Sequence, residues 1–304
     1  MSSGAAVRKR LASAASLGDV VKTMKSLASV RVHQYRSTMR ALDASTLTLD
    51  RAARALLQLH PELADAPLTS SDVTITVVFG SERGLCGAFN ERMARFAAGS
   101  VAEGARHSAV AEGARHADAP EAVSHVIAVG RRVVRRLRSV GLEPAAQLAA
   151  PSSLSTVDAS VAELLDLIEG FRRHNLDDRV RLVYARPVGA TRFEPRTVQV
   201  LPIDQVWMRG LRDRPWETNK RPMELSDPVK LLRGLIRHRM ALAFVKAYGS
   251  SLAAENAARL MAMEAASRTI EERLERLRAQ HHAARQAAVT AELLDIQSAA
   301  DALA

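Results

Sequence analysis

The chain has 304 residues, of which 47% are hydrophobic and 25% are charged, so it has the length and apolar content for a folded core. Aromatic residues make up only 4%, which favours long helices with narrow contacts over an interior filled by bulky rings. The single cysteine, Cys86, excludes an internal disulfide framework and a zinc site built from cysteines.

The formal net charge of +10 fits an anionic partner: nucleic acid, a membrane surface or an acidic protein. No apolar run approaches the ~20 residues that span a bilayer, and the first residues lack the apolar core of a secretory signal. We therefore expect a soluble chain whose start is that of the mature protein, of bacterial origin.

The first predicted element is a long helix that ends before Pro61. No glycine or proline interrupts residues 19–60, and at a rise of ~1.5 Å per residue these 42 residues alone span roughly 63 Å. Apolar or small residues recur in steps of three and four, a heptad stripe that needs a partner helix. The stripe consists of Leu17, Val21, Met24, Ala28, Tyr35, Met39, Leu42, Leu49, Ala53 and Leu56, with Arg31 and Thr46 filling its two gaps.

The middle of the sequence alternates strand-like and helix-like segments. Short β-branched runs occur at 73–80, 125–130, 179–188 and 196–203, and helical stretches at 131–140 and 154–174. This alternation predicts an α/β domain, which we place at residues 70–210. The sequence VAEGARH occurs at 101–107 and again at 110–116, a duplication that we interpret as replication slippage on a surface helix or loop.

A second long helix is predicted at residues 225–304, with Ser226 or Asp227 as N-cap and Pro228 in its first turn. Its heptad stripe narrows toward the C-terminus, through Ile270, Leu274, Leu277, His281, Ala284 and Ala288. We expect this helix to pair with the helix of residues 1–60 as an antiparallel coiled coil. The predicted fold class is a Rossmann-like α/β domain inserted between long terminal helices.

A glycine-rich segment, residues 79–91, follows the first predicted strand and leads into a helix. Backbone amides in this setting can cradle phosphate, but the segment has neither a Gly-Lys-Ser/Thr ending nor the GxGxxG pattern. We interpret Gly84, Cys86, Gly87 and Asn90 as a tight structural turn, with a nucleotide site as the alternative. No partner for a cysteine nucleophile is evident, so Cys86 is expected to be a small packed residue.

The first forty residues carry eight positive charges against one negative charge, that of Asp19. A basic helix of this kind suits an acidic partner, although a solvated helix face would have the same composition. Only Tyr35 could stack on a base there, which disfavours nucleic acid. His281 and His282 are adjacent and lack a second ligand at helical spacing, so no metal site is expected.

Three stretches, residues 7–36, 81–91 and 251–303, resemble the gamma subunit of F-type ATP synthases in the same order and spacing. The most specific part of the resemblance is ARQAAVTAELLDI at 284–296. The resemblance implies a rotor subunit present in a single copy. Its terminal helices would turn inside a ring of alpha and beta subunits, and its α/β domain would rest with epsilon on the membrane-embedded c-ring.

The resemblance also implies roles for individual residues. Met24 and Lys25 would face an acidic loop of the beta subunit, and the catch loops of beta would be met by Arg285, Gln286, Thr290 and Glu292. A gamma subunit has no catalytic residue, cofactor or metal of its own. It lies at the cytoplasmic face of the bacterial plasma membrane, and couples the flow of ions to nucleotide chemistry on beta.

The sequence departs from the family pattern at residues 16–21, at Glu82, and at Ser298-Ala299-Ala300, where a glycine is usual. Whether protons or sodium ions are moved, and whether the complex makes or hydrolyses ATP in the cell, is left open. The alternative function is a stand-alone basic coiled-coil scaffold that binds nucleic acid or an anionic membrane, and an enzyme built on the α/β domain comes third.

Overall fold

The computed structural model describes residues 2–65, 73–112, 123–172, 178–189, 192–217, 219–220 and 223–301. They form two packed units: a paired-helix unit of residues 1–29 and 259–304, and an α/β unit of residues 30–258. Helices α1 and α7 contribute to both units. The elements are α1 (Ser2–Leu59), α2 (Glu62–Asp65), β1 (Val73–Phe79), α3 (Phe89–Glu112), β2 (Val123–Val129), α4 (Arg131–Ser139), β3 (Ala146–Leu148), the 3-10 turn η1 (Leu154–Thr156), α5 (Val157–Phe171), β4 (Arg179–Val188), β5 (Arg192–Leu201), α6 (Gln205–Arg212) and α7 (Pro228–Asp301).

The sheet of the α/β unit has five strands in the order β3-β2-β1-β4-β5. Strands β1 to β4 are parallel, and β5 pairs antiparallel with β4 at one edge. The α/β fold predicted from the sequence is therefore confirmed, with a mixed sheet, and β4 has the predicted bounds. The run at 196–203 belongs to a strand that begins four residues earlier, at Arg192.

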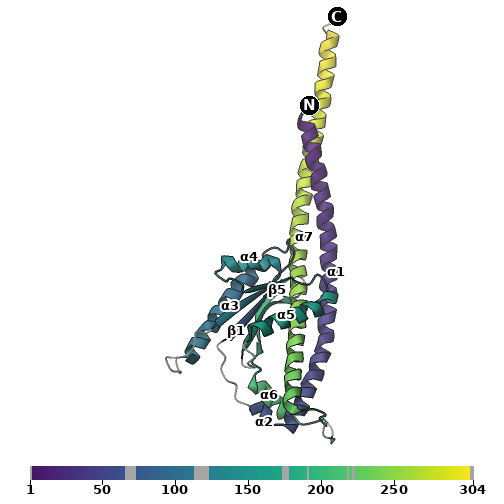
Figure 1. Cartoon of the computed structure of the whole chain (residues 1–304). Helices are drawn as coiled ribbons and strands as arrows, with labels where there is room; N and C mark the ends of the chain where they lie inside the picture. Colours follow the sequence, from purple (N-terminus) through teal and green to yellow (C-terminus); the bar gives the residue numbers. More distant parts are fainter. Residues whose placement is uncertain are drawn as a thin grey trace. The chain divides into compact units, whose positions relative to one another are not determined.

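Two apolar clusters cover the two faces of the sheet, and Figure 1 shows the helices that supply them. On one face, α5 and α7 pack against the inward residues of the strands, with Phe244 and Tyr248 fully buried. On the other face, α3 and α4 contribute Phe89, Met93 and Val133. The duplicated VAEGARH begins within α3, and its second copy extends outside the described residues.

Helices α1 and α7 run antiparallel within the α/β unit. Asp50 lies 3.3 Å from Arg239, and Asp43 lies 3.1 Å from Lys246. Gly249 leaves room for the side chain of Met39, since an added Cβ would lie 2.1 Å from the Met39 terminal methyl group. At its start, α7 has the predicted N-cap: the Asp227 carboxylate accepts a 2.9 Å hydrogen bond from the Lys230 backbone.

The same antiparallel pairing occurs in the paired-helix unit, with a seam that differs in part from the prediction. Gly18 faces Ile270, since a Cβ on Gly18 would lie 3.4 Å from the Ile270 side chain. Leu17 is 54% exposed, so its placement in the stripe was wrong by one residue. Ala288 is exposed too, because the register from Gly18 and Ile270 places it beyond Ser2, the first residue of α1.

The prediction of three domains, residues 1–60, 70–210 and 225–304, divides the chain by element type. The two packed units divide it by contacts, and each draws residues from both ends of the sequence. The three-domain division stays a prediction.

A pair of cysteines tests the register of the paired-helix unit. Gly18→Cys with Ile270→Cys should form an intramolecular disulfide on mild oxidation, because the two positions face each other within reach of a disulfide. Non-reducing gels and mass spectrometry of the full chain measure the product, and the native Cys86 is buried.

The matched control is Leu17→Cys with Ile270→Cys, since Leu17 points to solvent. Equal cross-linking of the two pairs would contradict the described register.

Candidate functional site

The glycine-rich segment after β1 is held by a buried side chain, Asn90. Its Oδ1 accepts a 2.9 Å hydrogen bond from the backbone N–H of Ser81, and its Nδ2 donates to the Ser81 hydroxyl at 2.7 Å. Both residues are buried. Because Asn90 lies in the first turn of α3, this reciprocal pair fixes the end of β1 to the start of the helix.

The remaining residues of the segment determine its backbone conformation or pack against the α/β unit. Gly87 has φ 56°, in the left-handed region that glycine adopts without strain. Cys86 is 3% exposed and packs in the cluster under α3 and α4, with its sulfur 3.5 Å from the Ser81 hydroxyl. Gly84 lies beside the Arg132 side chain. These are contacts of a structural turn.

A carboxylate of the chain itself occupies the N-terminus of α4. Glu82 accepts hydrogen bonds from the backbone N–H groups of Arg131, at 3.2 Å, and Ala150, at 3.3 Å, and also pairs with the Arg131 side chain. A helix N-terminus of this kind attracts anions. Here the anion is supplied internally, so a phosphate would have to displace Glu82.

Helix α7 covers the carboxyl ends of β1 and β4, where open α/β sheets commonly bind ligands. The ring of Tyr248 meets Phe79 at the end of β1, edge to face, with 4.8 Å between centroids. The Ser251 hydroxyl accepts a 3.2 Å hydrogen bond from the backbone of Ala185 in β4. Ala254 is fully buried in the cluster with Cys86. The usual ligand crevice of this fold is therefore filled by protein.

Lys25 and Met24 lie on α1 in the paired-helix unit, and both are half-buried. The Lys25 ammonium lies 3.4 Å from a carboxylate oxygen of Glu264 on α7, and each side chain is 41% exposed. Sequence reasoning did not identify Glu264, because its position on α7 becomes adjacent to Lys25 only once the register is known. At this exposure the pair contributes about 1 kcal/mol or less.

The four candidate residues near the C-terminus of α7 are all exposed: Arg285, Gln286, Thr290 and Glu292. The Thr290 hydroxyl donates to the backbone carbonyl of Gln286 at 2.9 Å, a bond within the helix. Arg285 lies 285 − 264 = 21 residues beyond Glu264, or ~30 Å along the helix axis. The structure therefore does not bring these residues together with Met24 and Lys25.

Sequence reasoning missed an apolar stripe beside these tip residues. Val289, Leu293 and Ile296 recur in steps of four and three and are 49%, 62% and 63% exposed. These residues repeat with the spacing of the heptad stripe that ends at Ala288 but are offset from it by one residue, so they lie on a neighbouring face of the helix. This face of α7 is apolar and open to a partner.

A charged cluster, termed the foot cluster, joins the end of α1 to α2, α6 and the segment before α7. Asp65 pairs with Arg209 at 2.8 Å and with Arg212 at 2.6 Å, and these guanidinium groups lower the pKa of the Asp65 carboxyl. His60 lies between Glu224, at 2.8 Å, and Glu62, at 3.1 Å. In the sequence, this part of the chain is a polar stretch that contains Trp207 and Trp216 and shows no pattern that indicates the cluster.

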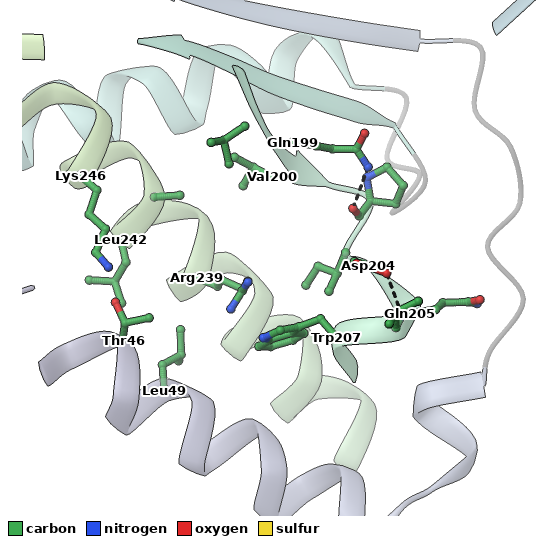
Figure 2. A pocket seen from close by; sticks show the side chains of 15 residues that line it. Thr46, Leu49, Gln199, Val200, Asp204, Gln205, Trp207, Arg239, Leu242 and Lys246 are labelled. Atoms are coloured by element: carbon green, nitrogen blue, oxygen red, sulfur yellow. Dashed lines mark hydrogen bonds between the residues drawn. The ribbon is translucent and has the colours of Figure 1, made fainter. Parts of the chain in front are cut away.

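A cavity of about 700 Å³ lies among α1, β5, α6 and α7 of the α/β unit (Figure 2). Its lining is mainly apolar, with Leu49, Val200 and Leu242 among it. The Arg239 guanidinium stacks over the Trp207 ring at 3.8 Å and pairs with Asp50, while burial lowers its pKa. Within the described residues, no group of three His, Cys, Asp or Glu side chains could hold a metal ion.

A family model described as ATP synthase matches residues 3–303. The chain belongs to the ATP synthase gamma-chain family. It is 27% identical to the ATP synthase gamma chain of Bartonella bacilliformis, with 98% of each chain covered, and 25% identical to that of a Polaromonas species, with both chains fully covered. Membership confirms the resemblance drawn from the three sequence stretches.

Solved structures share the fold of this family member. A chain of the Euglena gracilis mitochondrial ATP synthase, in a structure of its OSCP, F1 and c-ring, matches with a TM-score of 0.63 at 20% identity, covering 99% of this chain and 94% of that one. A chain of the Tetrahymena thermophila mitochondrial central stalk and c-ring matches at 0.52 and 19% identity, covering 82% and 99%. These relatives give no support to a stand-alone scaffold. No described helix is long and apolar enough to cross a membrane.

The Asn90 pair yields a stability prediction. Asn90→Ala should destabilise the chain by about 1–3 kcal/mol, because it leaves the buried N–H of Ser81 without an acceptor. Thermal unfolding followed by circular dichroism measures the loss. Ser81→Ala is the matched comparison: it keeps that N–H bonded to Asn90 and should cost less. An equal or larger loss in Ser81→Ala would contradict this account.

The foot cluster yields a pH prediction. Hydrogen bonds to Glu224, and more weakly to Glu62, raise the pKa of His60 above its usual value of about 6.5. Because folding raises this pKa, the interaction of protonated His60 with the two carboxylates stabilises the folded state fully below pH ~6.5. This stabilisation is lost as the pH rises through the pKa of His60 in the folded state.

Histidine ring NMR signals, assigned with His60→Gln, report the titration directly. We expect a midpoint above 6.5 that falls toward 6.5 in Glu224→Gln. A midpoint that does not move in Glu224→Gln would show that this pair does not set the pKa.

Proposed function

We propose that the chain is the central-stalk rotor subunit of an F-type ATP synthase, coupling ion flow through a membrane sector to ATP synthesis or hydrolysis on beta subunits. The observation that carries the proposal is the family match over residues 3–303, which includes both long helices and the α/β unit. Coverage of 98% or more of two curated gamma chains supports a role for the whole chain and not for one part.

The subunit would act by differential binding and not by chemistry of its own. The crevice of the α/β fold is filled by α7, and Glu82 occupies the N-terminus of α4, which supports a subunit without a catalytic site. A shaft of two unlike helices presents different faces to beta subunits that are otherwise equivalent. It thereby favours a different nucleotide affinity in each, and rotation exchanges these affinities.

The proposed contacts with beta are Met24 and Lys25 on α1, and Arg285, Gln286, Thr290 and Glu292 on α7. The exposure of the four tip residues, and the open apolar face of Val289, Leu293 and Ile296, support a bearing at this end. Lys25 already has Glu264 at 3.4 Å, so an acidic loop would share its charge with Glu264. Each exposed contact is worth ~1 kcal/mol or less, so the bearing depends on their number.

The proposed partners are alpha and beta subunits, an epsilon subunit and a c-ring, with one rotor chain per complex. The Tetrahymena structure combines a central stalk with a c-ring, and this chain has its fold. Near the foot cluster, Val206, Met223 and Leu225 are 75%, 84% and 89% exposed, which suits an interface with such partners. We place the complex at the cytoplasmic face of a bacterial plasma membrane, with protons or sodium ions as the coupling ion.

Truncation of α7 tests the proposal. The chain ending at residue 290 should assemble with cognate alpha and beta subunits in lower yield, yet retain part of ATP-driven ion pumping, because the paired helices remain. The chain ending at residue 250 should fail in coupling, since the α1 stripe in the paired-helix unit then loses its partner at ~25 cal/mol per Å² of apolar surface.

Each truncated chain is co-expressed with the cognate subunits, and both ATP hydrolysis and ion pumping are followed. Pumping that survives the longer truncation undiminished would mean that these helices are not the drive shaft. Failure of the full chain to co-purify with alpha and beta subunits would overturn the proposed function itself.

A further inference from the structure

A second cavity, termed the arginine cavity, lies between α3 and the strands β4 and β5, on the face of the sheet opposite α5. It has a volume of about 1,070 Å³, at the upper end of the ~300–1,000 Å³ typical of small-molecule sites. It lies apart from the carboxyl-end crevice that α7 fills. Neither the family match nor the rotor function accounts for it.

The cavity exists because the inner face of α3 changes in residue size along its length. Near its start, Phe89, Met93 and Ala97 are buried against the sheet. Farther along, the lining residues are the smaller Ser100 and Gly104. The residue type also changes along β4, from the buried and apolar Val183 and Ala185 to arginines at 179 and 181.

The lining is strongly cationic. The described residues around the cavity include four arginines, from α3, β4 and β5, against one carboxylate, that of Glu103. The arginines are Arg95, Arg179, Arg181 and Arg196. Arg95 also pairs with Glu91 within α3. Several arginines lining one hollow suit phosphate oxygens, which guanidinium groups bind through paired N–H donors.

Arg181 is the best-placed of these cations. Its side chain is half-buried against α3, where an added Cβ on Gly104 would lie only 1.9 Å from its Nη1. Burial, and the neighbouring charge of Arg179, lower the pKa of the Arg181 guanidinium. Among the described residues, no carboxylate lies within ion-pair distance of it. An anion in the cavity would offset this repulsion.

We propose that the arginine cavity binds a small molecule with two or more linked phosphate groups, of which pyrophosphate is the simplest and a nucleoside triphosphate a larger example. The concave shape favours a compact oxyanion over a flat lipid surface. Phe96, which also lines the cavity and is 38% exposed, offers a ring face to a base if the ligand is a nucleotide.

Isothermal titration of the full chain with pyrophosphate, and separately with ATP, tests the proposal at about 50 mM salt. We expect saturable binding of one pyrophosphate per chain, which weakens as salt is raised because the contacts are charged. Arg181→Gln should weaken binding at least tenfold. Arg135→Gln removes the same charge from the exposed face of α4, away from the cavity, and should change affinity less than twofold.

A matched pair of glycines gives a second test that removes no charge. Gly104→Ala should weaken binding at least fivefold, because its methyl group displaces the Arg181 guanidinium. Gly170→Ala lies in α5 on the opposite face of the sheet, outside the cavity lining, has no atom within 4 Å of its added methyl group, and should leave binding unchanged. Circular dichroism of each variant confirms that α3 is intact.

The possible results either support or overturn the site. Tighter binding of ATP than of pyrophosphate identifies a nucleotide, and equal binding identifies an oligophosphate; both support it. No saturation by 1 mM, an equal loss in Arg135→Gln, or an unaltered Kd in Arg181→Gln overturns it.

Binding only to vesicles containing phosphatidylglycerol, and not to phosphatidylcholine vesicles or pyrophosphate, would show a membrane surface instead and would also overturn it. None of these results bears on the rotor function, which is tested by assembly.

Discussion

The burial of residues 251–257 of α7 on all sides is the constraint on which the α/β unit depends. Every residue from 251 to 257 is buried, including the small Ala253, Ala254 and Ala257. A helix that is buried all round must meet neighbours on every face, and here these are the two apolar clusters of the sheet and helix α1. Small side chains allow that many neighbours to approach. This need for small side chains is reflected in the sequence, which is rich in alanine and poor in aromatic residues.

This arrangement explains how a fold that often holds nucleotides can lack their usual site. The carboxyl ends of β1 and β4 are met by Tyr248 and Ser251, and the N-terminus of α4 is met by Glu82. The carboxylate of Glu82 therefore occupies the position at the N-terminus of α4 where a phosphate would bind.

The sequence predicted the elements whose periodicity is long or whose boundaries carry a capping residue. The bounds of β4 and the N-cap Asp227 are as expected. The three residues of β3 are too few to show a period, and α6 was not distinguished within its polar, Trp-bearing stretch. In the seam of α1 only Leu17 was misplaced, since the other predicted residues are buried or half-buried. The contact is made by Gly18 instead, a residue type that does not indicate burial.

The site could be predicted only as far as residue types allowed. Exposed residues on one helix, such as Arg285 and Thr290, can be placed on that helix by counting. Contacts between distant segments cannot, since Glu264 beside Lys25, Glu82 beside Ala150, and Arg181 beneath Gly104 all depend on register and tertiary packing. Such pairs carry no local pattern, and only an arrangement in space identifies them.

One consequence follows from where the pairing of α1 and α7 ends. The register places Ala288 beyond Ser2, so residues 288–301 form four turns of helix without a described neighbour in the paired-helix unit. A single helix of that length is marginal in water, and resists bending and twisting far less than a packed pair. The described residues supply no second helix here, so the stiffness of this end depends on what packs against it and not on α7 alone.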